Sequence, residues 1–156
     1  MPRPLIVITR LYATVRVWAR SRNGASVSTV LTYSIDGQFL TLTAVGTSTS
    51  EHRIATFMAI RRDPHVPSGS LLLVNAKDTA ERFDHQVLAD LIALTIRTLG
   101  PKLAPVCAVI FPASYVVESR WYQTIAAEKG LRVGLFKDES SARDWLSAYL
   151  PSPVET

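Results

Sequence analysis

The residues with reactive side chains are few in this sequence, and their spacing matches no common catalytic or metal-binding motif. Cys107 is the single cysteine and lies in an apolar run, whereas a reactive thiol needs a neighbouring base and access to solvent. His52, His65 and His85 lack the spacing of zinc ligands, and neither a glycine-rich phosphate loop nor a nucleophile elbow is present. We therefore expect a buried, inert cysteine, surface or capping histidines, and a protein that is not an enzyme and uses no metal or cofactor.

The elements that would position these side chains alternate between strands and helices. Strands are predicted near 29–35, 39–45, 70–75, 106–111 and 131–136, and helices begin near 48, 84, 116 and 138. Asp36-Gly37 predicts a tight turn between the first two strands. Helical crossovers between the later strands predict parallel pairing. The fold class is therefore α/β, a mixed and mostly parallel sheet with an N-terminal β-hairpin and four helices in the order ββαβαβαβα.

Local signals set the ends of these helices and their buried faces. Ser48 and Glu51 have the spacing of a capping box, and Asp63-Pro64 ends the first helix. Residues 77–83 are predicted to form a loop or a short helical turn before Asp84, which can cap the second helix. The predicted buried residues of the first helix are Ile54, Phe57 and Met58, and those of the third are Val117, Trp121 and Ile125.

The basic residues are concentrated at the N-terminus. The first 35 residues hold five arginines and no acidic residue, whereas the rest of the chain has 12 basic and 13 acidic residues. We interpret residues 1–26 as a basic extension, 27–150 as the folded domain and 151–156 as a tail. The extension fits a targeting peptide, an extra strand or a disordered segment, and peripheral membrane contact is one use of its arginines. Because the predicted domain lacks a basic stripe, we do not expect nucleic-acid binding.

Three blocks of sequence resemble the STAS and SpoIIAA-like domains. They are Leu71–Asn75, Ala108–Phe111 and Val133–Leu146, and the similarity spans about Val27–Leu150. The resemblance implies a non-catalytic regulatory or protein-interaction domain. In signalling members of that family, a serine in an Asp-Ser-Ser-Gly-like loop after the third strand is phosphorylated by a partner kinase.

The corresponding stretch of this chain, residues 75–82, has neither the serine pair nor the glycine of that loop. Asp78-Thr79 is the part that is similar, so Asp78, Thr79 and Arg82 are the candidate residues for binding a protein partner. For Thr79 the simpler interpretation is an ordinary turn residue. The departure from the motif puts a phosphorylation switch in doubt and makes the chain more similar to members suspected of carrying small apolar ligands.

Large aromatic residues in the last two helices suggest where such a ligand would bind. Trp121, Tyr122, Trp145 and Tyr149 either pack against the sheet as core or form the wall of an apolar pocket. Two functions therefore stay open, a regulatory domain with a protein partner and a carrier or sensor of a small apolar, lipid-like ligand. We expect a cytoplasmic protein, with a homodimer as one arrangement, since the lone cysteine suits a reducing compartment.

Overall fold

The computed structural model describes residues 10–20, 26–47, 49–80 and 83–150, with side chains described from residue 31 onward. Its strands are β1 (Arg10–Arg20), β2 (Ser26–Asp36), β3 (Phe39–Gly46), β4 (Ser70–Thr79), β5 (Leu103–Ile110) and β6 (Arg132–Phe136). Its helices are α2 (Ser50–Arg62), α3 (His85–Leu99), the 3₁₀ turn η1 (Gly100–Lys102), α4 (Val116–Glu128) and α5 (Glu139–Ser147). From β2 onward this is the predicted order of strands and helices.

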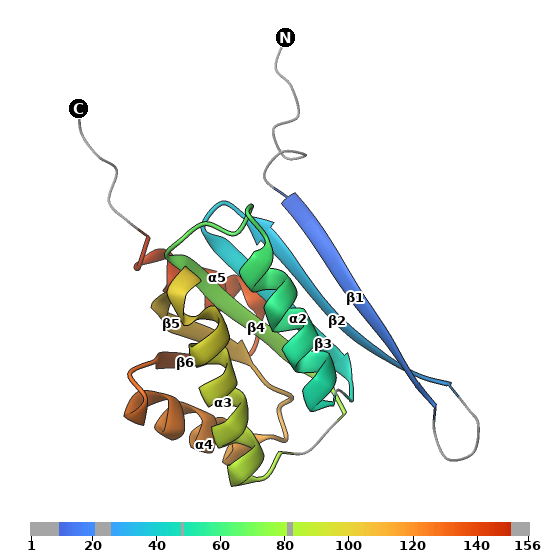
Figure 1. The fold of residues 1–156 in the computed structure, drawn as a ribbon. Helices are drawn as coiled ribbons and strands as arrows, with labels where there is room; N and C mark the ends of the chain where they lie inside the picture. The colour runs from blue at the N-terminus through green and yellow to red at the C-terminus, as the bar shows by residue number, and fades with distance from the viewer. Residues whose placement is uncertain (1–9, 21–25, 48, 81–82, 151–156) are drawn as a thin grey trace, which may run out of the picture.

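The six strands form one sheet in the order β1-β2-β3-β4-β5-β6 (Figure 1). The pairs β1–β2 and β2–β3 are antiparallel, whereas β3, β4, β5 and β6 are parallel neighbours. Strand β1 pairs with β2 from Arg10 opposite Asp36 to Arg20 opposite Ser26. An extra strand was one of the three interpretations of the N-terminal segment, and β1 corresponds to it. Residues 1–9, 21–25 and 151–156 lie outside the described residues.

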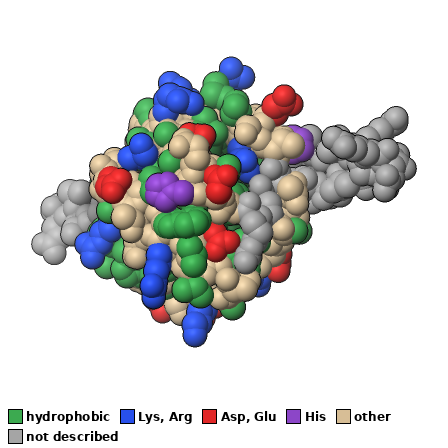
Figure 2. All heavy atoms as spheres, turned by 90° about the horizontal axis from the view of Figure 1, so that it is seen from below, with side chains coloured by type: hydrophobic (Ala, Val, Ile, Leu, Met, Phe, Trp, Pro, Cys, Tyr) green, Lys and Arg blue, Asp and Glu red, His purple; other side chains and the backbone are tan. Residues whose placement is uncertain are grey.

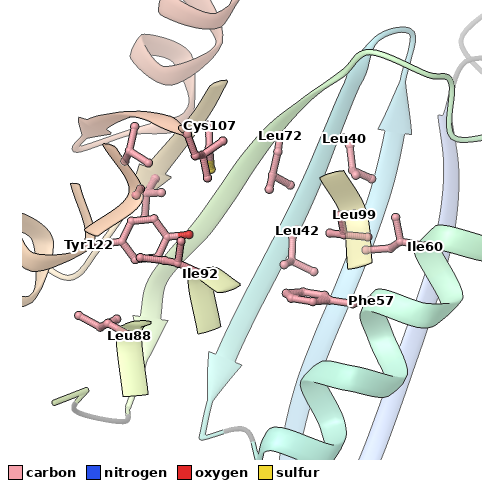
Figure 3. Close-up of a cluster of buried hydrophobic side chains, with 14 of the residues drawn as sticks. Leu40, Leu42, Phe57, Ile60, Leu72, Leu88, Ile92, Leu99, Cys107 and Tyr122 are labelled. Carbon is pink, nitrogen blue, oxygen red and sulfur yellow. The ribbon is translucent and has the colours of Figure 1, made fainter. Parts of the chain in front are cut away.

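Helices cover the two faces of the sheet unequally. Helices α2, α3 and α4 pack on one face, where residues such as Leu42, Leu72 and Val109 meet Phe57 and Ile92 in the larger core (Figure 3). On the other face, α5 packs against β4, β5 and β6. Its core is Leu71, Leu73, Val106, Ala108, Ile110, Ala142 and Leu146. Alternate residues of a strand point to opposite faces, so a continuous apolar run such as β4 is what burial on both sides requires.

The face under α5 is packed closely enough to need a glycine. A Cβ atom on Gly134 of β6 would lie 2.7 Å from Cε2 of Phe136 and 3.0 Å from Cη2 of Trp145. The two rings themselves are in contact, with centroids 5.4 Å apart. Arg143 of α5 extends this contact to the hairpin, where its Nη1 lies 3.2 Å from Oδ2 of Asp36. Helix α5 therefore contacts both the edge strand β6, through Trp145, and the β2–β3 hairpin, through Arg143.

The predicted turn and capping box are each shifted by one residue. The hairpin loop is Gly37-Gln38 rather than Asp36-Gly37, because Asp36 still pairs with Phe39. Gly37 has a φ of +61°, which favours glycine at that position. At the start of α2 the N-cap is Thr49, whose hydroxyl accepts a hydrogen bond from the backbone N–H of His52. The imidazole of His52 accepts from Thr49 in return, so histidine takes the place that glutamate has in the usual box.

Two predicted helix faces and one loop differ from the structure. In α2, Phe57 is buried as expected, but Ile54 is exposed. In α4, Ile125 is buried as expected, but Tyr122 is buried and Val117 is exposed. Both helices have weakly separated apolar and polar residues, so burial follows the sheet beneath them. Strand β4 also continues through Thr79, so residues 77–79 are strand and not loop.

Candidate ligand cavity between the sheet and its helices

A cavity of about 70 Å³ lies inside the larger core, between the sheet and helices α2, α3 and α4. Most of its lining is apolar, and it comprises Leu31, Leu42, Ala44, Arg53, Phe57, Leu72, Val74, Ala76, Thr79, Phe83, Leu91, Thr95, Val109, Phe111 and Tyr122. Ala44, Ala76 and Phe111 place it at the carboxyl ends of β3, β4 and β5. Ligands of α/β sheets commonly bind outside these strand ends.

Small residues next to rigid rings explain why this part of the core is not filled. Ala44 and Ala76 occupy the strand ends where longer side chains would reach the helices. On one side, the ring of Phe111 meets Phe83 edge-on at 6.5 Å and Tyr122 at 5.7 Å, measured between centroids. Aromatic rings that hold one another in edge-to-face contact cannot collapse into a neighbouring space as flexible chains do. A void is left where alanine meets this aromatic wall.

Two polar residues of the lining have hydroxyl groups that bond to the backbone. The hydroxyl of Thr79 donates to the carbonyl oxygen of Gly46 at 3.1 Å, which ties the end of β4 to the end of β3. The hydroxyl of Thr95 donates to the carbonyl oxygen of Leu91 at 2.8 Å, within α3. Half-buried Arg53 of α2 supplies a charged side chain to the same lining. The threonines therefore present mainly their methyl groups to the cavity.

Burial raises the pKa values of two titratable groups in this core. Desolvation raises the pKa of the fully buried Cys107 thiol to about 12. Desolvation, with the nearby Cys107 as a smaller cause, also raises the pKa of the Tyr122 hydroxyl well above its ordinary value. Both groups hold their protons at neutral pH, so neither is a nucleophile there. The expectation of a buried, inert Cys107 agrees with this environment.

The histidines lie where capping and surface roles place them. His52 caps α2, and Nδ1 of His65 lies 3.1 Å from Oδ1 of Asp63 at the end of that helix. His85 is exposed at the start of α3 and meets the ring of Trp121 edge-on at 5.6 Å. Within the described part of the chain, no group of three His, Cys, Asp or Glu side chains could hold a metal ion.

The candidate residues for a protein partner are placed as follows. Asp78 is exposed in β4 and is paired with Val45 of β3. Thr79 is buried, and its hydroxyl donates a hydrogen bond to the carbonyl oxygen of Gly46. It stands in a strand five residues before the N-cap Asp84, and not at a helix start. Arg82 lies outside the described residues. Of these three candidate residues, Asp78 is therefore the one that the structure describes with an exposed side chain.

The four aromatic residues predicted as pocket walls are divided between the two faces. Tyr122 lines the cavity, and Trp121 lies beside it in α4, packed against the larger core and His85. Trp145 and Tyr149 contact each other on the opposite face, with ring centroids 5.3 Å apart. The structure therefore brings Tyr122 to the cavity and places the Trp145–Tyr149 pair on the α5 side.

Sequence reasoning missed most of the lining. Phe57 was predicted to be buried, but Phe83, Phe111 and the alanines at the strand ends were not assigned a role. The signal that could have found them is positional, since Ala44, Ala76 and Phe111 all occur at the carboxyl ends of predicted or nearby strands. A small residue at the carboxyl end of a strand leaves space in the core, and ligands of α/β sheets commonly bind at these strand ends.

The end of the molecule that carries these strand ends has mixed charge. Figure 2 views the molecule from below Figure 1, and on that face acidic and basic side chains are interspersed around apolar groups and a histidine. Among the described side chains of this face, the basic residues therefore do not form a continuous stripe. Among the described residues, no helix is both long enough and apolar enough to cross a membrane.

Comparison with known proteins does not identify a family for this chain. The resemblance to STAS and SpoIIAA-like domains was based on short blocks in order, and no known family, protein or structure that matches the chain supports it. The site must therefore be interpreted from its own residues. Neither the family models, nor the curated proteins, nor the solved structures contain a match to this chain.

Proposed function

We propose that this protein binds a small apolar ligand in the cavity under α2, α3 and α4, and acts as its carrier or sensor. The observation that carries the proposal is an apolar cavity inside the core, at the carboxyl ends of three parallel strands. Binding sites for small molecules are typically concave and apolar with a few polar groups, and this lining has that composition. Cys107 and Tyr122 both keep their protons, which favours binding over catalysis.

The size of the cavity limits the ligand. At about 70 Å³ it is roughly half of the 150 Å³ engineered cavity that takes benzene. A molecule of four or five heavy atoms is the class that enters without rearrangement. A longer chain requires α2 and α3 to separate, and the shallow groove between them, lined by residues such as Ile54 and Leu94, is where that opening would begin.

A filling variant tests the proposal. Ala76→Leu places a larger side chain into the cavity, so it should abolish binding of butane-sized probes in methyl NMR titrations while the fold is retained. Ala126→Leu is the matched control, because Ala126 is fully buried in the same core but does not line the cavity. This control variant should overpack the core and lower the free energy of unfolding by about 1–3 kcal/mol. If wild-type protein shows no shifts with any such probe, and native mass spectrometry finds no retained ligand, the proposal fails.

The second candidate function is the regulatory, protein-interaction domain that the resemblance implies. It is favoured by Val116 and Val117 in the first turn of α4, whose exposed fractions are 56% and 53%. They lie at the same carboxyl edge of the sheet as Asp78. Recovery of a specific partner should fall for Val116→Ser, Val117→Ser protein but not for the control Ile54→Ser, which alters an exposed residue of α2. Equal recovery with all three proteins would exclude this surface.

A further inference from the structure

A second, larger cavity opens to the outside of the molecule, between the start of α4 and the ends of β5 and β6. Its volume is about 450 Å³, which is in the range of clefts that bind small organic molecules. One rim is the turn before α4, where the backbone N–H of Tyr115 donates to the carbonyl oxygen of Pro112 at 2.9 Å. The other rim is the end of β6 with Lys137. This α4–β6 cleft therefore lies outside the carboxyl ends of two parallel strands, where ligands of α/β sheets commonly bind.

The floor of the α4–β6 cleft is apolar and is supported by the larger core. Val109 is fully buried beneath it, and Phe111 and Leu135 are half-buried at its surface. The ring of Phe111 stacks on the ring of Tyr115, with centroids 6.2 Å apart. Val116 adds an apolar side chain that is 56% exposed. A ligand with an apolar body would cover this surface and remove it from water.

The charged residues of the lining are both cations. Arg120 of α4 and Lys137 line the cleft, and none of the described lining residues is acidic. Neither cation forms an ion pair with a described residue, unlike Arg143, which pairs with Asp36. Both side chains are exposed, so an anion in contact with them keeps part of its hydration and avoids the cost of a buried charge. The cleft thus combines an apolar floor with positive charge at its mouth.

We propose that the α4–β6 cleft binds a small amphipathic monocarboxylate. The carboxylate contacts Arg120 and Lys137, and the apolar body rests on Phe111, Leu135 and Val116. The guanidinium group of arginine matches the geometry of a carboxylate, and the extent of apolar lining favours an organic acid over an inorganic anion. This site is distinct from the core cavity, although Val109 and Phe111 line both, so the inference goes beyond the proposed function and does not depend on it.

Three probes separate the charged head from the apolar body. Phenylacetate has both, phenylacetamide is its uncharged counterpart of the same shape, and acetate is the head alone. Each is titrated into wild-type protein at pH 7 and low salt, and the methyl NMR signals of Val116 and Leu135 report on the cleft. Wild-type protein should bind phenylacetate more tightly than either other probe. Its preference over phenylacetamide should weaken as salt is added, because the contacts lie at the surface.

A double variant and a matched control locate the recognition. In Arg120→Gln, Lys137→Gln protein the preference for phenylacetate over phenylacetamide should fall about fivefold, as expected for two exposed charge contacts. The control Arg61→Gln, Arg62→Gln makes the same change in net charge with two exposed residues at the end of α2, outside the cleft, and should keep the wild-type preference. Ala76→Leu, which fills the core cavity, should leave phenylacetate binding unchanged.

Four results would overturn the inference. They are no shift with phenylacetate, equal affinity for phenylacetate and phenylacetamide, acetate binding as tightly as phenylacetate, and an equal loss of preference in the cleft variant and its control. Loss of phenylacetate binding in Ala76→Leu would place the probe in the core cavity and would also count against the cleft. None of these results decides the proposed function, which is tested with small uncharged probes in the core cavity.

Discussion

Leu72 and Leu73 are adjacent in β4 and both fully buried, yet they enter two differently built halves of the protein. Leu72 faces three helices and borders the cavity, whereas Leu73 faces α5 in a core that includes Ala142 and Leu146. The first half combines leucines, aromatic rings and alanines that leave a space. The second half is packed so closely that Gly134 has no room for a Cβ atom. One sheet thus provides a rigid support on one face and a site with free volume on the other.

The largest effect should come from shortening each leucine in turn. Leu72→Ala and Leu73→Ala should each lower the free energy of unfolding by about 2–5 kcal/mol, as measured by urea denaturation. The two variants should then differ in their response to benzene. Leu72→Ala enlarges an existing cavity and should regain stability on binding, whereas Leu73→Ala should not. Equal rescue of both would show that the faces do not differ in the way described.

Gly134→Ala should have the next largest effect, because it tests the tight face directly. The added Cβ displaces the rings of Phe136 and Trp145, which should lower the free energy of unfolding by about 1–3 kcal/mol. The double variant Gly134→Ala, Phe136→Leu removes the closest ring and should recover part of that loss relative to Phe136→Leu alone. An unchanged melting temperature for Gly134→Ala would contradict the close packing under α5.

Tyr33 tests how the cavity face is anchored, since its hydroxyl joins β2 to Asp63 at the end of α2. Desolvation, with Asp63 as the second cause, raises the pKa of Tyr33 from 10.0 to about 12. Below pH 10 both folded and unfolded chains keep this proton, so its stabilisation is complete. As the pH rises towards 12 the unfolded chain loses the proton first, so the free energy of unfolding falls.

Tyr33→Phe should cost about 1 kcal/mol at pH 7 and should remove this part of the alkaline loss. The measurement is the difference between wild-type and variant unfolding free energies from pH 8 to 11.5. Cys107 and Tyr122 also titrate at high pH, and taking the difference cancels them. A difference that does not change with pH would show that Tyr33 is not held by burial and Asp63.

Arg143→Ala should have the smallest effect, although it breaks a contact between α5 and the hairpin. The side chain pairs with Asp36 and lies with its Cζ 4.9 Å from the centroid of the Phe39 ring. Both charged groups are about one-third exposed, so the loss should stay below about 1 kcal/mol. The ion-pair part should weaken as salt is added, while the loss of contact with Phe39 should persist. A loss above 2 kcal/mol would make this pair a main support of α5.

The order of elements could be predicted from the sequence, and the candidate site in large part could not. Continuous apolar runs such as that in β4 and helix-ending prolines such as Pro64 are local signals, so the elements from β2 onward were confirmed. The buried faces of α2 and α4 depend on what lies beneath them, which is why Ile54 and Val117 were misplaced. The cavity arises from the meeting of strand ends that are far apart in the chain, and no local pattern records how well they fill space.

The order of the strands has a consequence for how the chain acquires its structure. Each strand from β2 to β6 lies beside the one made just before it, so a chain leaving the ribosome can add one neighbour at a time to a growing edge. Assembly in this sequence avoids waiting for a distant segment, which is what slows many parallel sheets. The contact between Asp36 and Arg143, 107 residues apart, would then be among the last to close.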